Sequence, residues 1–141
     1  MNTPVLTMTL KLLYYLIFSF ILLGCDYYDG RLEVQNNTSH VIAVETFLDS
    51  IPTLSELNKT EYYLQNSINP NETERLIEMG STKGWSFRIE KSNNNRLNLF
   101  VFQIDSLKMY GIDSLISLGI YDKYIFSEKE LDEKNWKVVI E

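Results

Sequence analysis

Apolar and polar residues alternate over short segments in much of the chain after residue 30, which is the pattern of half-buried β-strands. In the segment 31–35, Leu32 and Val34 alternate with charged and amide side chains, and a second apolar segment covers 40–47. The residues 36–39 between them, Asn-Asn-Thr-Ser, are typical of a turn. These segments therefore predict a β-hairpin.

The middle of the chain predicts a loop and further short strands. The segment 49–58 contains a proline and mixed polar residues, which favours a loop. Strands are predicted at 62–64 and 74–79, separated by a turn at 69–71 (Asn-Pro-Asn). The segment 85–90, Trp-Ser-Phe-Arg-Ile-Glu, fits either a strand or a short helix, and its pattern leaves both open.

The segment 96–103 is the strongest strand pattern in the chain. Its apolar side chains alternate between the two faces of a sheet, with Leu97, Leu99 and Val101 on one face and Phe100 and Phe102 on the other. A strand that is apolar on both sides is covered on both sides. We therefore expect this strand at the centre of a sheet.

Two aspartates in the carboxy-terminal third predict helix starts. Asp105 is the expected N-cap of a helical turn that runs through residue 110, and Asp113 is the expected N-cap of a second short helix. Gly119 predicts the end of that second helix. Its apolar residues are expected to point inward: Leu115, Ile116 and Leu118.

The end of the sequence predicts a strand, a helix and a closing strand. The first strand covers 120–126. Ser127 and Glu130 match the capping box S-x-x-E and predict a helix to about residue 134, held to the core by Leu131. The closing strand covers 136–140, with Trp136, Val138 and Ile140 on one side.

This order of elements, strands first and mixed elements later, predicts an α+β fold. We expect one globular domain over 31–141, built on an antiparallel β-sheet or a β-sandwich-like arrangement with short helices in the carboxy-terminal third. A parallel, doubly wound sheet is disfavoured because regular alternation of strands and helices is missing.

An apolar segment precedes this domain. It covers 12–24, and these 13 residues are fewer than the roughly 20 that a helix needs to cross a bilayer. With Lys11 before it, the segment resembles a secretory signal. The sequence Leu-Leu-Gly-Cys at 22–25 resembles the bacterial lipobox, in which the cysteine receives a diacylglycerol. We therefore expect 1–24 to be a lipoprotein signal peptide, Cys25 to be lipidated and 25–30 to be a short tether.

This motif predicts the location of the protein. Several acyl chains on one residue anchor a protein stably in a membrane. We expect lipid anchoring in the cell envelope, at the outer membrane of a Gram-negative bacterium. The motif leaves open which leaflet the domain faces.

Composition narrows the function classes. Of the 141 residues, 45% are hydrophobic and 13% aromatic, which fits a globular domain. The net charge of −6 disfavours nucleic-acid binding, which needs a basic face. With one cysteine and one histidine, the chain offers no disulfide framework and a poor set of metal ligands, and no cofactor is expected.

The carboxy-terminal part carries a family resemblance. The segments LNLFVFQIDSLKMY (97–110) and YDKYIFSEKELDEKNWKVVI (121–140) resemble the pattern of an uncharacterised family of small Bacteroidetes lipoproteins. In that family an apolar strand leads to D-[ST]-L-x-x-Y, then to K/R-Y-x-[LF]-[ST], then to W-x-[IV]. The strand-turn-strand segment 31–47 is similar to the amino-terminal part of the family. The resemblance implies the same envelope location and no established activity.

Candidate catalytic groups are weak. His40 with Ser39, or Glu128 with Glu130, are the pairs that could supply acid–base chemistry. A turn position accounts for His40, and helix capping accounts for the glutamates. We expect a non-enzymatic module that binds a protein or a glycan partner. The alternative is a small envelope hydrolase with an unrecognised site.

Aromatic residues are the candidates for partner binding. Trp85 and Trp136 are expected to be core anchors. Tyr62 and Tyr63 are the better candidates for exposure, because adjacent residues of a strand face opposite sides and cannot both enter one core.

Three triplets resemble the Asp-[Ser/Thr]-apolar signal for O-glycosylation of exported Bacteroidetes proteins. They predict modification at Ser50, Ser106 and Ser114. Helix capping by Asp105 and Asp113 explains the last two triplets independently. Ser50 is the clearer candidate because it lies in the proline-containing loop.

Overall fold

The computed structural model describes residues 28–54, 59–80 and 83–141. A four-stranded antiparallel sheet forms its centre, in the order β4 (Ser67–Ile68), β3 (Ile42–Phe47), β7 (Leu97–Gln103) and β8 (Asp122–Phe126). A three-stranded sheet follows the order β5 (Thr73–Arg75), β2 (Glu33–Asn36) and β9 (Lys137–Ile140), in which β2 and β9 are parallel. The remaining pair is β1 (Tyr28–Asp29) with β6 (Glu78–Met79).

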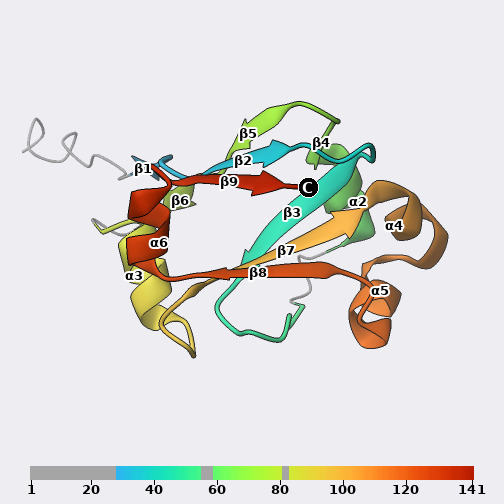
Figure 1. Ribbon diagram of the computed structural model, residues 1–141. Helices are drawn as coiled ribbons and strands as arrows, with labels where there is room; N and C mark the ends of the chain where they lie inside the picture. Colours follow the sequence, from blue (N-terminus) through green and yellow to red (C-terminus); the bar gives the residue numbers. More distant parts are fainter. Residues whose placement is uncertain (1–27, 55–58, 81–82) are drawn as a thin grey trace, which may run out of the picture.

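Five short helices flank these sheets in the described residues: α2 (Thr60–Gln65), α3 (Trp85–Lys91), α4 (Ile104–Tyr110), α5 (Ile112–Leu118) and α6 (Glu128–Glu133). Figure 1 shows α2, α4 and α5 together at one end of the central sheet, and α3 and α6 at the other end. The predicted α+β fold of antiparallel sheet and short helices is confirmed.

The strand β7 is central, as its sequence predicts. It pairs with β3 on one side and β8 on the other, and its residues Leu97–Phe102 are all buried. Leu97, Leu99 and Val101 enter a first core beside β2, β9, α3 and α6. Phe100 and Phe102 enter a second core beside α2, α4 and α5. The strand β7, which is apolar on both faces, therefore contributes side chains to both cores.

The predicted hairpin of 31–35 with 40–47 is wrong. The two segments form β2 and β3, which belong to different sheets. The buried side chain of Asn36 donates to the backbone carbonyls of His40 (2.8 Å) and Ile68 (2.9 Å). These bonds turn the chain away from β2 before β3 begins, so that β2 pairs with β9 and β5 instead.

The segment 62–64 is helical rather than extended. It lies within α2, where Tyr63 is 1% exposed and packs on Phe102 with 5.7 Å between ring centroids. The predicted strand 74–79 is divided between β5 and β6, which pair with different partners. The open choice at 85–90 is resolved as the helix α3.

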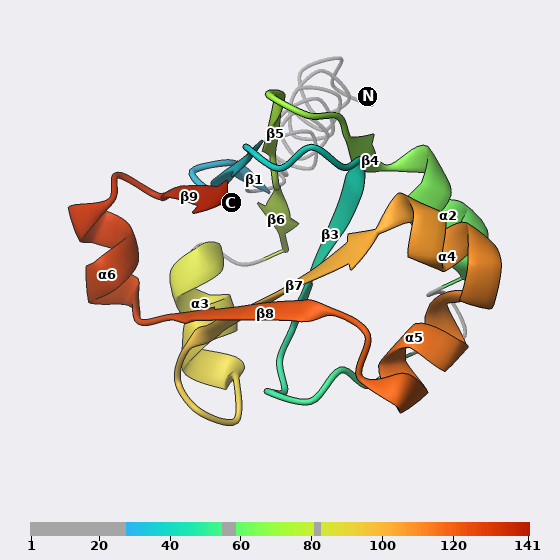
Figure 2. The same cartoon turned by 45° about the vertical axis from the view of Figure 1, so that its right-hand side comes forward.

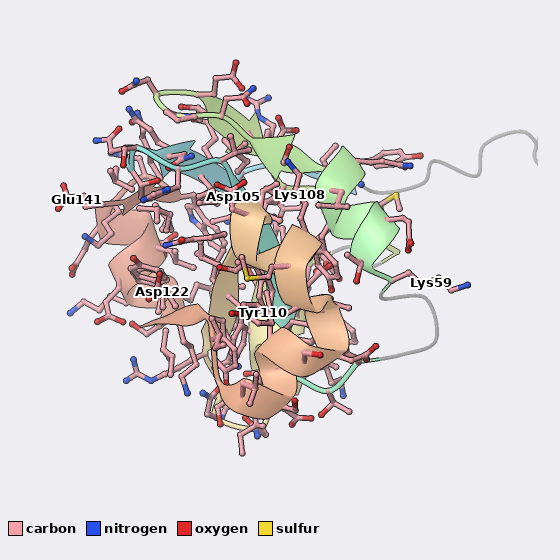
Figure 3. All side chains as sticks on the ribbon, turned by 90° about the vertical axis from the view of Figure 1, so that its right-hand side faces the viewer. Lys59, Asp105, Lys108, Tyr110, Asp122 and Glu141 are labelled. Carbon is pink, nitrogen blue, oxygen red and sulfur yellow. The ribbon has the colours of Figure 1, made fainter. Side chains whose placement is uncertain are left out.

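Asp105 and Asp113 lie in the first turns of α4 and α5, but neither is the N-cap. Gln103 and Gly111 occupy those cap positions without a side-chain bond. The Oγ1 of Thr60 accepts instead from the N–H of Ile112 at 3.0 Å, so α2 caps α5. Figure 3 shows Asp105 and Lys108 along α4, on the helical side of the molecule.

Most other carboxy-terminal predictions are confirmed, but the strand predicted at 120–126 begins at Asp122. Gly119 ends α5 in the left-handed conformation, and Ser127 forms a full capping box with Glu130. Trp136 is buried, as is Trp85. Leu118 is 64% exposed, so the prediction that it points inward is wrong.

The described chain begins inside the folded domain rather than in a free tether. Tyr28 and Asp29 form β1, and Asp29 is 3% exposed. Its carboxylate accepts from Arg31 Nη2 (2.9 Å) and from the N–H of Trp85 (3.0 Å). Residues 28–30 of the predicted tether therefore belong to the fold, while Cys25 lies outside the described residues.

Candidate functional site

A groove with a volume of about 490 Å³ runs along one edge of β3. Its walls are the end of α2, the segment 74–78 and the start of α3. A second hollow of about 340 Å³ shares Glu45, Thr46 and Arg88 with it and continues toward the loop at 47–49. Figures 1 and 2 both show β3 between α2 on one side and β6 with α3 on the other.

The groove exists because β4 is short. It pairs with β3 only at Ile42 and Ala43. Beyond them, the segment 44–47 of β3 has β7 on one edge and no partner strand on the other edge among the described residues. The chain after β4 leaves for the three-stranded sheet, and its return through 74–78 forms the opposite wall.

At Thr46, side chains occupy the backbone groups of this open edge. The Oε1 of Glu45 accepts from the N–H of Thr46 at 2.9 Å. Arg88 donates from Nη2 to the carbonyl of Thr46 and from Nη1 to Oε2 of Glu78 at 3.3 Å. Both polar groups of Thr46 that a docking strand would use are therefore engaged.

Burial raises the pKa of the Glu45 carboxyl, and the negative charge of Glu78 adds to this effect. The N–H of Thr46 and the positive charge of Arg88 act in the opposite direction but do not cancel it. A carboxyl in this setting holds a proton more readily than an exposed glutamate does.

Two buried N–H donors at the groove lack a hydrogen-bond partner among the described residues. They are Nε1 of Trp85, a residue that is 2% exposed, and Nε of Arg88. Both residues line the groove. A buried donor without an acceptor costs about 1–3 kcal/mol. An acceptor brought in by a ligand would remove that cost.

Tyr62 lies at the same groove and is 48% exposed. Burial raises the pKa of its phenol, and the charge of Glu45 raises it further. Tyr62 therefore keeps its place as a candidate for partner binding. The prediction for Tyr63 is wrong: on a helix, adjacent residues point about 100° apart, and this turn carries Tyr63 into the second core.

The candidate catalytic pairs do not come together as a site. His40 is exposed before β3, and its carbonyl accepts from the side chain of Asn36. Glu130 is taken up by the capping box: the N–H and the hydroxyl of Ser127 donate to it, which lowers its pKa. Glu128 accepts from the hydroxyl of Ser86. Within 28–54, 59–80 and 83–141, no cluster of histidine and acidic side chains could hold a metal ion.

The three predicted glycosylation serines lie apart from the groove and are all half-buried. Ser50 lies in the bend after β3, where its carbonyl accepts from Lys123 Nζ at 3.0 Å. Ser106 lies in α4 and Ser114 in α5. The loop position of Ser50 agrees with its sequence interpretation, and modification of all three stays a prediction.

Sequence reasoning missed Glu45 and Arg88. The signal was present, because Glu45 interrupts the apolar segment 41–47 and Arg88 sits between the apolar positions Phe87 and Ile89. A charged residue inside an apolar pattern is costly to bury, and it points to a paired or functional group.

None of the helices in the described part of the chain has the length and apolar character to cross a membrane. Comparison with protein-family models, with curated proteins and with solved structures found no match.

Proposed function

We propose that this chain is an envelope lipoprotein, anchored through Cys25, whose folded domain is a non-enzymatic module that binds a protein or glycan partner. The location rests on the apolar segment 12–24 followed by the lipobox-like Leu-Leu-Gly-Cys, and on the resemblance to small Bacteroidetes lipoproteins. The outer membrane is the membrane we propose.

One observation supports binding above the others: two buried hydrogen-bond donors at the groove have no acceptor among the described residues. Trp85 Nε1 and Arg88 Nε have no partner in the described residues, although most buried polar groups in proteins have one. Glu45, with an Oε2 that no described donor occupies, lies in the same groove. A polar ligand that carries both acceptors and donors would match these three groups in kind.

Binding is favoured over catalysis by the state of the carboxylates. Glu78 is held by Arg88, and Glu45 already accepts from its own neighbour Thr46. The observation that favours a hydrolase is the raised pKa of Glu45 beside Glu78, because a general acid acts in its protonated form.

The anchor is tested by labelling cells with an alkyne analogue of palmitate. The wild-type protein should be labelled, and Cys25→Ser should abolish the label and leave a precursor of higher mass. Ser39→Ala, in an exposed turn, is the matched control and should be labelled like the wild type. Labelling of the Cys25→Ser protein would overturn the anchor.

Partner binding is tested by placing a photo-crosslinking phenylalanine analogue at position 62 in living cells. Position 110 is the control, because Tyr110 is exposed to almost the same extent (49% against 48%) but lies away from the groove. Figure 3 shows Tyr110 where α4 meets α5. An envelope adduct from position 62 and none from position 110 is expected. Equal adducts, or none, would overturn binding at this groove.

The hydrolase alternative needs its own assay. Purified protein is incubated with envelope polysaccharide and peptidoglycan, and newly released reducing ends are measured. No release above the background is expected. Release that disappears in Glu45→Gln would replace the binding proposal with a hydrolase.

A further inference from the structure

We infer that the groove beside β3 takes a neutral saccharide, with Trp85, Arg88 and Glu45 as its polar contacts and Tyr62 as its stacking surface. This inference rests on the proposed binding function and deepens it by choosing the class of ligand.

The hydrogen-bonding groups of the groove match sugar hydroxyls. Trp85 Nε1 and Arg88 Nε can only donate, and each needs an acceptor. The second oxygen of the Glu45 carboxylate has no donor among the described residues and can accept one. A hydroxyl accepts from one group while it donates to another, so the hydroxyls of a sugar match all three groups in kind. The volume of about 490 Å³ lies within the range of about 300–1,000 Å³ that is usual for small-molecule sites.

The charges around the groove disfavour a charged ligand. Three carboxylates line it, from Glu45, Glu74 and Glu78, and they would repel an anion. Its two arginines are already paired, Arg75 with Glu33 at 2.7 Å and Arg88 with Glu78 at 3.3 Å. A cation would meet the donor groups of Trp85 and Arg88, which it cannot satisfy. A neutral ligand avoids both conflicts.

A peptide strand is disfavoured by the edge itself. Addition of a strand to a sheet needs free N–H and C=O groups along the edge. At Thr46 the side chains of Glu45 and Arg88 occupy both groups. Blocking an edge in this way is a means by which proteins prevent strand pairing.

Tyr62 supplies the apolar part of the site. Its ring is half-exposed at the groove and rests edge to face on Tyr63, with 5.3 Å between centroids and an interplanar angle of 82°. Tyr63 is in turn fixed in the second core. Because Tyr63 supports it, the ring of Tyr62 offers a rigid apolar face to the C–H groups of a pyranose.

The direct test uses the two indole N–H signals of the chain in a ¹H–¹⁵N NMR spectrum. Trp136 Nε1 already donates to Asp132 at 2.8 Å, whereas Trp85 Nε1 has no described acceptor. The full chain is purified in a polyoxyethylene detergent, which contains no sugar. It is titrated with maltotetraose, cellotetraose, xylotetraose, mannotetraose and N-acetylated chitotetraose, and in parallel with tetragalacturonate as an acidic probe.

The expected result is that at least one neutral tetrasaccharide shifts the Trp85 signal downfield in a saturable way. The Trp136 signal should stay in place, and tetragalacturonate should have no effect. Tyr62→Ala should weaken the binding by about fivefold, Tyr62→Phe should retain it within about twofold, and Tyr110→Ala should leave it unchanged. Tyr62→Phe keeps the aromatic ring and loses only the hydroxyl. If it still binds while Tyr62→Ala binds more weakly, the ring face is the group that contacts the saccharide.

Failure of this inference is distinguishable from failure of the proposed function. If no neutral probe moves the Trp85 signal up to 10 mM while position 62 still crosslinks to an envelope protein, the saccharide inference is overturned and the binding module stands. A shift caused equally by tetragalacturonate, or one that persists unchanged in Tyr62→Ala, would also overturn it.

Discussion

Glu45 shows how one residue can serve a site at a cost to the fold. Burial raises its pKa, so the folded chain takes up a proton at a higher pH than the unfolded chain does. In that pH range the native state binds more protons, and stability therefore falls as the pH rises. Once it is ionised, the buried carboxylate is therefore a destabilising group, and we infer that the groove rather than the core requires it.

Glu45→Gln should therefore raise the free energy of unfolding at about pH 7, because the amide keeps an acceptor for Thr46 and loses the buried charge. The advantage over the wild type should shrink as the pH falls toward 4.5, the ordinary value for a glutamate. Urea unfolding at both pH values measures this. Glu61→Gln, on the exposed side of α2, should change stability by less than about 0.5 kcal/mol. A variant of Glu45 that is less stable at pH 7 would contradict the argument.

Asn36 is the residue that decides the path of the chain between the sheets. It is fully buried, donates to the carbonyls of His40 and Ile68, and accepts from the N–H of Thr38 at 3.0 Å. Asn36→Ala should destabilise the fold by about 3 kcal/mol, because buried acceptors lose their partners. Asn37→Ala, at the exposed neighbour, should cost less than about 0.5 kcal/mol in the same denaturation experiment. Equal effects would show that the amide does not direct the turn.

The local sequence predicted the helices and strands whose determinants lie within their own residues. The strand β7 follows from its two-sided apolar pattern, and α6 follows from the Ser127–Glu130 box. The helix α2 did not follow, because Tyr62 and Tyr63 are typical of strands, whereas the packing of Tyr63 on Phe102 in the second core joins residues far apart in the sequence. The cap that Thr60 gives to α5 also joins distant residues, and alternation alone cannot reveal it.

The candidate site was less predictable than the fold. Tyr62 was predicted as an exposed aromatic residue, but the reason for that prediction, a strand at 62–64, was wrong because the segment is helical. Glu45, Arg88 and Trp85 meet only because β4 stops early and the chain changes sheets before it returns. That meeting depends on strand pairing between residues far apart in the sequence, and no local pattern specifies it.

The capping box of α6 should contribute to the stability of the domain. Ser127 Oγ accepts from the N–H of Glu130 at 3.3 Å, so Ser127→Ala should destabilise the domain by about 1 kcal/mol at neutral pH. Bonds from the N–H and the hydroxyl of Ser127 lower the pKa of Glu130, and their contribution is present above the ordinary value of 4.5 and lost as the pH falls below it. The difference between variant and wild type should therefore narrow in acid. Thermal unfolding at pH 7 and pH 3 measures it, with Ser39→Ala as the neutral control, and a constant difference would count against the box.

The first described strand, β1, is bound to the rest of the domain by strand pairing and by the side chain of Asp29. Among the described residues β1 pairs only with the two residues of β6, but the carboxylate of Asp29 reaches α3 and accepts from the N–H of Trp85. Burial opposes ionisation of Asp29, yet the bonds from Arg31 and Trp85 outweigh it and lower its pKa. If the lipid is attached at Cys25 as proposed, the bonds of Asp29 hold the chain to the domain four residues after the anchor.

Gly84 allows Asp29 to approach the start of α3 closely. It has a φ of +52°, and a Cβ at this position would overlap the Cβ and the carboxylate of Asp29. Gly84→Ala must therefore either separate β1 from α3 or strain the backbone, and it should cost about 3 kcal/mol or more. Gly119→Ala is the control: its φ of 69° and ψ of 26° are the left-handed conformation, which alanine reaches at about 1 kcal/mol, and no atom lies near its Cβ. Gly84, with φ of 52° and ψ of −126°, lies outside that region, so its backbone adds to the cost of the overlap with Asp29. Hydrogen exchange should also show faster exchange at the N–H of Trp85 in Gly84→Ala and not in Gly119→Ala. Equal costs and unchanged exchange would mean that the close approach of Asp29 to α3 does not hold the amino-terminal strand in place.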